Sequence, residues 1–188
     1  QYIKSTVNNK TYYYDELSSN VNFNYVDIDN KICSLDSNSF GTDTLSGFER
    51  IIFLDSTLAL DLGQGETTGQ IYRLYNAAFS REPDLEGLNY YISKIEDSNY
   101  SIQSIAMNFL NSPEFNIRHG TNLPANDFVT TFYKNVLNRE ASTDELLWYE
   151  TRIKNDSFSR FDVLLGFSES PENIFLTTAL IDDIISLC

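Results

Sequence analysis

The sequence contains few of the residues on which most catalytic, metal and nucleic-acid sites depend. Its 188 residues include one histidine, two cysteines and 13 lysines and arginines, against 27 aspartates and glutamates. Cys33 and Cys188 lie far apart without metal-ligand spacing, so neither a zinc site nor a disulfide framework is indicated. Because phosphate binding needs clustered positive charge, the net charge of −14 argues against nucleic acid and anionic membranes as partners.

Catalytic signatures and long apolar runs are also missing. No GxSxG, HExxH or P-loop pattern occurs, and we expect the single histidine, His119, to be a solvated loop residue. Acidic pairs such as Asp182 and Asp183 arise by chance among so many carboxylates. No apolar run approaches the roughly 20 residues that span a bilayer. We therefore expect a protein that is not an enzyme and has no membrane span.

What the sequence does contain is a duplication. Residues 71–115 recur without a gap at 129–173, so that Arg81 returns as Arg139 (139 − 81 = 58) and Ser-Pro-Glu at 112–114 returns at 170–172. Other matched positions are apolar or aromatic: Tyr75 and Tyr133, Leu88 and Leu146, Tyr91 and Tyr149, Ile95 and Ile153, Phe109 and Phe167. A repeated supersecondary unit produces such a pattern, because each copy must build the same core.

Within each copy the apolar residues follow helical spacing. Ile71, Leu74, Tyr75, Ala78 and Phe79 fall at i, i+3, i+4, i+7 and i+8, which places them on one helical face. Further helix starts are indicated by Asp84 or Ser142, by Ser101 or Ser159, and by each Ser-Pro-Glu triplet. The sequence predicts a mainly α protein with two tandem helical repeats, 69–120 and 124–175. We expect about six to seven helices, the last at 171–187.

Residues 1–66 have a different character and favour strands. Val21, Phe23 and Tyr25 alternate with polar residues, and the phase then reverses, which predicts a bulge near Tyr25–Val26. A turn at 29–31 should lead into a return strand through Ile32 and Leu35. Other candidate strands are 12–14, 50–54 and 57–62. We predict a small N-terminal antiparallel β-rich lobe at 1–66, followed by the duplicated helical domain at 67–188.

Matched charges in the two copies predict two structural bridges. Arg81 and Arg139 each follow the first helix of a copy, and Glu114 and Glu172 each begin the fourth. A guanidinium at a helix C-terminus can cover unpaired carbonyls and bind a neighbouring carboxylate. We expect Arg81 to pair with Glu114 and Arg139 with Glu172. The functional alternative is a pair of anion-binding sites.

Two further sets of residues are candidates for ligand contacts. Asp36, Asp43 and Asp55 lie in the turn-rich region, and carboxylate oxygens are ligands that calcium prefers, although aspartate is also common in turns. Tyr90 and Trp148 occupy the same position in the two copies and are candidate glycan or partner contacts. Helical spacing favours packing as the role of these aromatic residues.

The helical half resembles a bacterial domain of unknown function, DUF4214. The stretches that carry the resemblance are 71–75, 79–88, 128–132, 136–139 and 163–173, of which the last is the most specific, and the segment 47–61 is similar to the lead-in found in such proteins. The resemblance implies a duplicated helical module of secreted, surface-layer-like or adhesin-like proteins, exported by one-step (type I) secretion and without assigned catalysis. Relatives often carry calcium-binding repeats upstream, of which only half a unit, 41–45, is present here.

These observations lead to one expected function and one rival. We expect a non-catalytic structural module of the bacterial cell surface that acts in S-layer-like assembly or adhesion, through self-association or contacts with other surface proteins or glycans. The rival is a carbohydrate- or receptor-binding module, including one displayed on a virus particle. The apolar-acidic end, 177–188, is expected to close the helical core, or alternatively to serve as an export signal.

Overall fold

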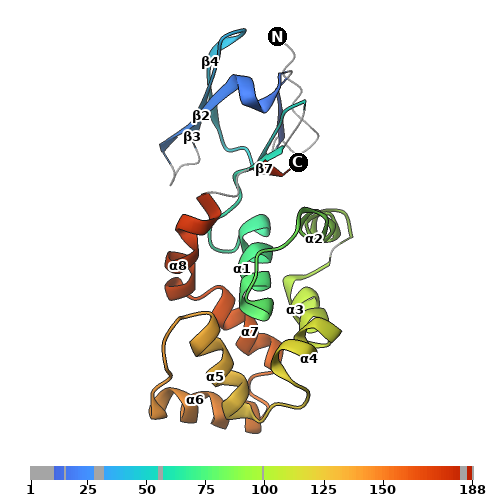
Figure 1. The fold of residues 1–188 in the computed structure, drawn as a ribbon, viewed down its shortest axis with the longest axis vertical. Coiled ribbons are helices and arrows are strands. Elements are labelled where there is room, and N and C mark those ends of the chain that lie inside the picture. The colour runs from blue at the N-terminus through green and yellow to red at the C-terminus, as the bar shows by residue number, and fades with distance from the viewer. Residues whose placement is uncertain are drawn as a thin grey trace. The chain divides into compact units, whose positions relative to one another are not determined.

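The computed structural model describes residues 11–14, 16–27, 32–54, 57–98, 100–182 and 186–187. The chain divides into two compact units, one formed by Gln1–Leu62 with Asp182–Cys188 and the other by Gly63–Ile181 (Figure 1). The first unit is rich in strands and the second is helical. The predicted division near residue 66 is therefore close, but the C-terminal residues group with the β-rich unit and not with the helical one.

One sheet of the β-rich unit is antiparallel, with strand order β2-β3-β4. Its strands are β2 (Val21–Asp27), β3 (Ile32–Ser37) and β4 (Gly41–Ser46). The register shifts between Tyr25 and Asp27, as the reversal of sequence phase predicts. The predicted turn at 29–31 lies outside the described residues. β4 lies outside the predicted strands, because residues 41–45 match half of a calcium-binding repeat and show no strand-like alternation of apolar residues.

The other sheet has the order β1-β5-β6-β7. Its strands are β1 (Thr11–Tyr13), β5 (Arg50–Ile52), β6 (Thr57–Ala59) and β7 (Ser186–Leu187). β5 pairs with β6 and β6 with β7 antiparallel, as predicted for this region, whereas β1 pairs with β5 in parallel, which the sequence did not predict. Buried Tyr12, Ile51 and Leu58 belong to the apolar core of this unit, and Arg50 donates to the buried carboxylate of Asp61.

The predicted C-terminal helix at 171–187 is too long. The last helix ends at Asp182, and Ser186–Leu187 adds to the sheet as β7, antiparallel to β6. An edge strand leaves a row of backbone donors and acceptors unpaired, and a short additional strand satisfies some of them. The backbone of Ser186–Leu187 therefore extends a sheet of the β-rich unit.

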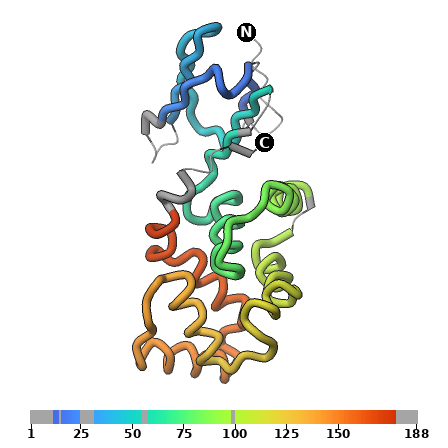
Figure 2. The backbone as a smooth tube through the Cα atoms, viewed as in Figure 1, coloured from blue at the N-terminus to red at the C-terminus, as the bar shows by residue number. Residues whose placement is uncertain are grey.

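The described residues of the helical unit form eight α-helices, more than the six to seven predicted. The first four are α1 (Thr67–Phe79), α2 (Leu85–Ser98), α3 (Ile102–Leu110) and α4 (Pro113–His119). The second four are α5 (Ala125–Asn135), α6 (Thr143–Lys154), α7 (Arg160–Ser168) and α8 (Pro171–Asp182). Each helix of the second set begins 58 residues after its counterpart, and Figure 2 follows repeat one in green to yellow and repeat two in orange to red.

Caps and turns repeat with the helices. Ser112 accepts a hydrogen bond from the backbone N–H of Phe115 and begins α4, as the Ser-Pro-Glu pattern predicts. Ser142 and Glu145 form the predicted capping box at the start of α6. Ser80 and Asn138, which follow the first helix of each repeat, both have a left-handed backbone, with φ of 49° and 53°. The duplicated unit therefore repeats its backbone conformation as well as its apolar pattern.

The core of the helical unit is built from aromatic residues at matched positions. The ring of Phe109 lies 4.7 Å from that of Tyr75, and the ring of Phe167 lies 4.9 Å from that of Tyr133, both edge to face. α3 and α7, which are equivalent helices, pack against each other, and α1 also packs against α7. The two repeats thus share one core. Among the described helices, none combines the length and apolar character needed to cross a membrane.

Candidate functional site

Both predicted arginine–glutamate pairs form. Nε of Arg81 donates to Glu114 Oε1 at 2.7 Å and Nη2 donates to Oε2 at 3.0 Å. The corresponding distances from Arg139 to Glu172 are 2.9 and 3.3 Å. Each pair is bidentate, a geometry that arginine can form and lysine cannot. Each bridge fastens the turn after the first helix of a repeat to the start of its fourth helix.

The guanidinium groups of these bridges have further partners within the protein. Arg81 lies 5.2 Å from the ring centre of Tyr75 and donates to the backbone carbonyl of Glu82 at 2.9 Å. Arg139 lies 4.6 Å from the ring centre of Tyr133 and donates to Glu140 O at 3.3 Å. Each guanidinium therefore contacts a carboxylate, a backbone carbonyl and an aromatic ring of the protein itself. This arrangement supports the structural role over an anion-binding one.

The second bridge contains an additional hydrogen-bonded carboxylate, whereas the Asp84 carboxylate beside the first lies 3.9 Å from Arg81 Nη1. Arg139 also donates to Glu145 at 2.9 and 3.2 Å, and the backbone N–H of Ser142 donates to the same carboxylate at 2.8 Å. The hydrogen bond from Arg139, followed by that from the Ser142 backbone, lowers the pKa of Glu145 to about 2. The equivalent residue in the first repeat is Gly87. The two repeats therefore differ at this position, where the second has a carboxylate bound to Arg139 and the first has no side chain.

The lowered pKa of Glu145 predicts a loss of stability in acid. Because the unfolded carboxyl has a pKa near 4.5, the unfolded chain binds this proton before the folded chain does. The stability contributed by Glu145 should be complete above about pH 4.5 and should be lost as the pH falls towards 2. We expect Glu145→Gln to remove part of this pH dependence in urea unfolding at pH 6, 4 and 3. Asp97→Asn, at an exposed position of α2, should leave the change of unfolding free energy with pH as it is in the wild type. An equal effect of both variants would contradict the prediction.

Gly87 is required by its contact with Tyr75. A Cβ at Gly87 would lie 2.5 Å from the Tyr75 hydroxyl, whose ring is held in the aromatic core. We expect Gly87→Ala to lower the free energy of unfolding by about 1–3 kcal/mol, because overpacking outweighs the gain in helix propensity. Gly166→Ala is the matched control, since its Cβ would meet no atom within 4 Å, and it should raise stability by up to about 1 kcal/mol. Urea titration of both variants measures the difference; stabilisation by Gly87→Ala would refute the packing argument.

Tyr90 and Trp148 are exposed, so they do not take the core position that helical spacing favours. They are 53% and 43% exposed, and the half-buried ring in each pair is the neighbouring tyrosine, Tyr91 or Tyr149. A cation one turn later lies over each exposed ring: Lys94 at 5.3 Å from Tyr90 and Arg152 at 3.6 Å from Trp148. Both repeats thus present an exposed aromatic–cation pair, with the face of Trp148 covered more closely.

The structure does not bring together Asp36 and Asp43, the two predicted calcium ligands that it describes. Asp36 faces away from the buried side of β3 and accepts from Thr42 at 2.9 Å. Asp43 is paired with buried Leu35 and therefore lies on the opposite face, near Tyr12. Asp55 lies outside the described residues. Calcium binding stays a prediction: a bound ion should raise the melting temperature and a chelator should lower it, whereas no change with either would oppose it.

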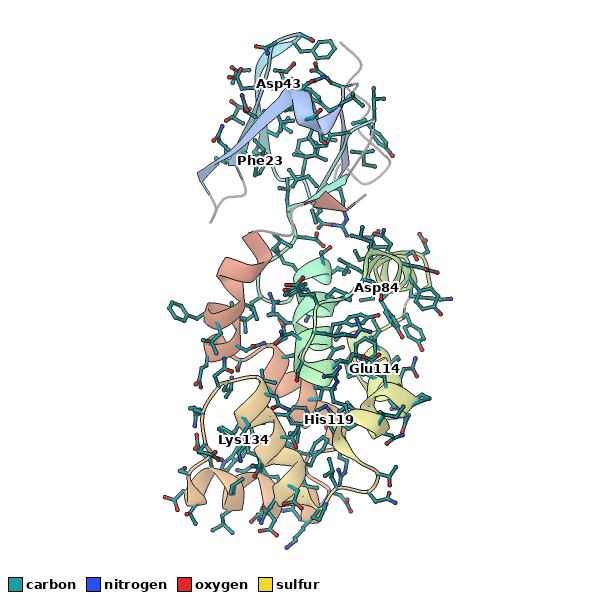
Figure 3. All side chains as sticks on the ribbon, in the orientation of Figure 1. Phe23, Asp43, Asp84, Glu114, His119 and Lys134 are labelled. Carbon is teal, nitrogen blue, oxygen red and sulfur yellow. The ribbon has the colours of Figure 1, made fainter. Side chains whose placement is uncertain are left out.

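The histidine prediction also needs correction. His119 is in the last turn of α4, half-buried against Phe115, and its Nε2–H donates to the carbonyl of Ala78 at 2.8 Å (labelled in Figure 3). Burial lowers the pKa of the His119 imidazole. Its contact joins α4 to α1. His119 is therefore a packed helix-end residue and not a solvated loop residue.

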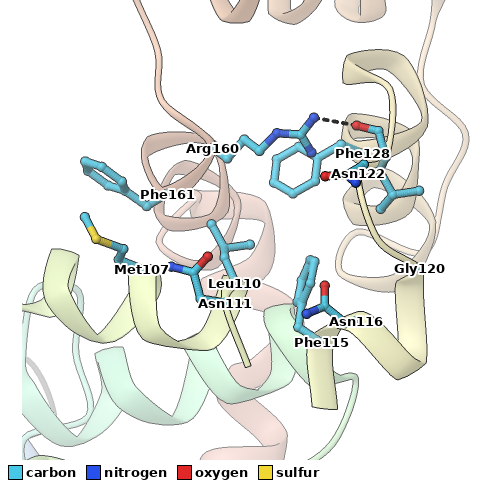
Figure 4. Close-up of a pocket in the computed structure, with 11 residues that line it drawn as sticks. Met107, Leu110, Asn111, Phe115, Asn116, Gly120, Asn122, Phe128, Arg160 and Phe161 are labelled. Atoms are coloured by element: carbon cyan, nitrogen blue, oxygen red, sulfur yellow. Dashed lines mark hydrogen bonds between the residues drawn. The ribbon is translucent and has the colours of Figure 1, made fainter. Parts of the chain in front are cut away.

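Sequence reasoning missed a groove at the junction of the two repeats. It has a volume of about 420 Å³ and lies between α3, α4, the loop at 120–124, α5 and the start of α7 (Figure 4). Phe115 and Phe128 are buried beneath it, and Arg160 donates to the carbonyl of Leu123 at its edge. The remaining lining residues are Met107, Leu110, Asn111, Asn116, Gly120, Asn122 and Phe161.

The lining of the groove is not duplicated between the two repeats. None of its lining residues has the same residue type at the equivalent position of the other repeat. Asn111 corresponds to Glu169, Asn116 to Ile174, and Arg160 to Ile102. Core positions repeat and groove positions do not, so a search for repeated residues cannot find this site.

The comparisons with known proteins identify a family but no individual relative. Neither the curated proteins nor the solved structures include a match to the chain. A family model described as a domain of unknown function, DUF4214, matches residues 61–115 and again residues 106–177. The two matches together span the helical unit and follow its duplication. The chain therefore belongs to the DUF4214 family.

Proposed function

We propose that this chain is a non-catalytic module that acts at a bacterial cell surface, in surface-layer-like assembly or adhesion. The observation that carries the proposal is a repeated exposure of large apolar side chains. Ile117 on α4 and Phe175 on α8 are 86% and 81% exposed, the highest values among the large apolar residues described, and they are equivalent positions of the two repeats. Two copies of one apolar contact point suit a protein that joins several partners.

The matched polar residues support a structural role as well. The repeated arginines, glutamates and serines are used in bridges and caps, as described above. Secretion and a surface location rest on the family resemblance. The net charge of −14 opposes close approach of identical chains, so self-association should strengthen with added salt.

Sedimentation velocity of the full chain tests the proposal. Over rising protein concentration, at 0.15 and 0.5 M NaCl, the wild type should form larger species, more so at the higher salt. Ile117→Asn combined with Phe175→Asn should remain monomeric. Leu54→Asn is the control, because Leu54 is an exposed apolar residue of the β-rich unit.

Adhesion has a separate readout, the retention of fluorescent protein on bacterial cells stripped of their own surface layer. A wild type that stays monomeric at both salt concentrations and is not retained on cells would refute the proposed function. Equal assembly by the Ile117/Phe175 double variant would show that another surface makes the contact.

A second candidate function is carbohydrate or receptor binding. The observation that favours it is the pair of exposed aromatic–cation contacts, Tyr90 with Lys94 and Trp148 with Arg152. Exposed aromatic faces are common contact points for sugars and for protein partners. Loss of glycan binding in Tyr90→Ala and Trp148→Ala would assign the contact to these residues.

A further inference from the structure

We propose that the groove between the two repeats binds a neutral saccharide unit, held by the side-chain amides of Asn111 and Asn116 over an apolar floor. This inference rests on the carbohydrate-binding candidate function but assigns the ligand to the groove in place of the exposed aromatic residues Tyr90 and Trp148. It also explains why the groove residues differ from their counterparts in the other repeat.

The dimensions and floor of the groove fit a small ligand. Its volume of about 420 Å³ falls within the range of about 300–1,000 Å³ that is usual for small-molecule sites. Phe115 and Phe128 are buried beneath it, so they are held by the surrounding core. Phe161 and Leu110, both half-buried, add apolar walls. A ligand with an apolar face would cover the exposed parts of Phe161 and Leu110 and displace water from them, while buried Phe115 and Phe128 support these walls from beneath.

Three amides surround the apolar floor. Asn111 ends α3, Asn116 is on α4, and Asn122 lies in the loop between the repeats (Figure 4). Within the described residues, no hydrogen bond involves the side-chain amide of any of the three. Each amide offers both donors and an acceptor, which is what a hydroxyl group requires of its partners. The groove therefore combines an apolar floor with polar groups that can bind several hydroxyls.

The charges of the groove select against other ligand classes. No carboxylate lines it, so it offers nothing to a cation. Its one charged residue, Arg160, donates to Leu123 O and lies 4.6 Å from the ring centre of Phe128, and the whole chain is strongly acidic, which disfavours an anion. A purely apolar ligand would bury amides without partners, which is costly. A neutral saccharide has both an apolar C–H face and several hydroxyls.

The arrangement also favours a saccharide over an extended peptide. A peptide backbone is best bound by amides in a row along one wall, whereas these three come from three separate segments around one pocket.

The test uses the full chain and defined probes. Saturation-transfer NMR screens glucose, galactose, mannose, N-acetylglucosamine and their common disaccharides, with a library of unrelated peptides in parallel. Calorimetry then measures the dissociation constant of the strongest saccharide. Asn111→Ala combined with Asn116→Ala should weaken binding at least tenfold without changing the melting temperature. Met107→Trp, which narrows the mouth of the groove at an exposed position, should weaken it independently.

Two controls separate this inference from the function on which it rests. Asn89→Ala removes an exposed amide outside the groove, and Trp148→Ala removes the exposed aromatic; both should bind as the wild type does. If no saccharide binds the wild type, both this inference and the carbohydrate-binding candidate are overturned. If saccharide binding is kept in the groove variants but lost in Trp148→Ala, the groove proposal is overturned and the carbohydrate-binding candidate function stands. Capture of peptides and not saccharides by the groove also overturns the inference.

Discussion

Replacing Arg73 by methionine should lower the free energy of unfolding by about 3–5 kcal/mol, far more than the same change at Arg81. The side chain of Arg73 is 0% exposed. Its Nε donates to Glu169 Oε1 at 2.6 Å, and its Nη2 donates to Glu169 Oε2 and to the carbonyl of Gly63, both at 2.9 Å. Methionine would fill part of the volume but would leave a carboxylate and a carbonyl without these donors.

The comparison with Arg81 isolates the effect of burial. Arg81 makes a similar two-pronged pair with Glu114, but both side chains are more than one-third exposed. Water can replace the lost partner there, so Arg81→Met should cost about 1 kcal/mol or less. Urea unfolding followed by circular dichroism measures both variants. Equal losses of unfolding free energy in the two variants would show that burial does not strengthen the Arg73–Glu169 pair.

A double variant tests whether the loss of stability comes from the carboxylate that Arg73→Met leaves unpaired. Arg73→Met with Glu169→Leu removes both charges, so no unpaired charge is left inside the protein. We expect it to recover much of the stability lost by Arg73→Met alone, because a buried ion pair can often be replaced by apolar residues at little cost. A double variant less stable than the single one would show that the two residues contribute separately.

The Arg73–Glu169 pair also shows why repeat-based reasoning has a limit. It joins α1 of the first repeat to the C-terminal end of α7 in the second. The equivalent positions hold Thr131 and Asn111, so neither charge is repeated. The matched positions, by contrast, predicted two bridges that both form. Sequence comparison between copies finds what each copy needs by itself and misses what holds the copies together.

The elements that the sequence predicts well are those with local causes. Helical spacing and serine caps depend on residues within one or two turns, so the helices and their starts could be predicted. The parallel pairing of β1 with β5 and the addition of β7 to β6 depend on distant partners. Strands of two or three residues carry too little pattern to identify such partners. Helical spacing also favours packing for Tyr90 and Trp148, whereas the structure exposes both side chains.

Truncating the central aromatic residue of either repeat should be similarly severe. Phe109 is buried against Tyr75, Phe79 and Tyr91, with ring centres 4.7, 4.7 and 5.2 Å away. Its counterpart Phe167 is buried among the rings of Phe132, Tyr133 and Tyr149. We expect Phe109→Ala and Phe167→Ala each to cost about 3–5 kcal/mol, because each leaves a cavity in a rigid aromatic cluster. Phe175→Ala, at an exposed position on α8, is the matched control and should change stability by less than about 0.5 kcal/mol.

The same variants determine whether the two repeats unfold together. Trp148 is the only tryptophan and lies in the second repeat, so its fluorescence reports on that repeat, whereas far-ultraviolet circular dichroism reports on helices of both. α7 packs against both α1 and α3, and Arg73 bonds to Glu169 across the junction, so the repeats have no separate cores. Phe109→Ala, in the first repeat, should therefore shift the urea midpoints of both signals equally. A fluorescence midpoint that stays at the wild-type value while the dichroism midpoint falls would mean that the second repeat folds independently of the first.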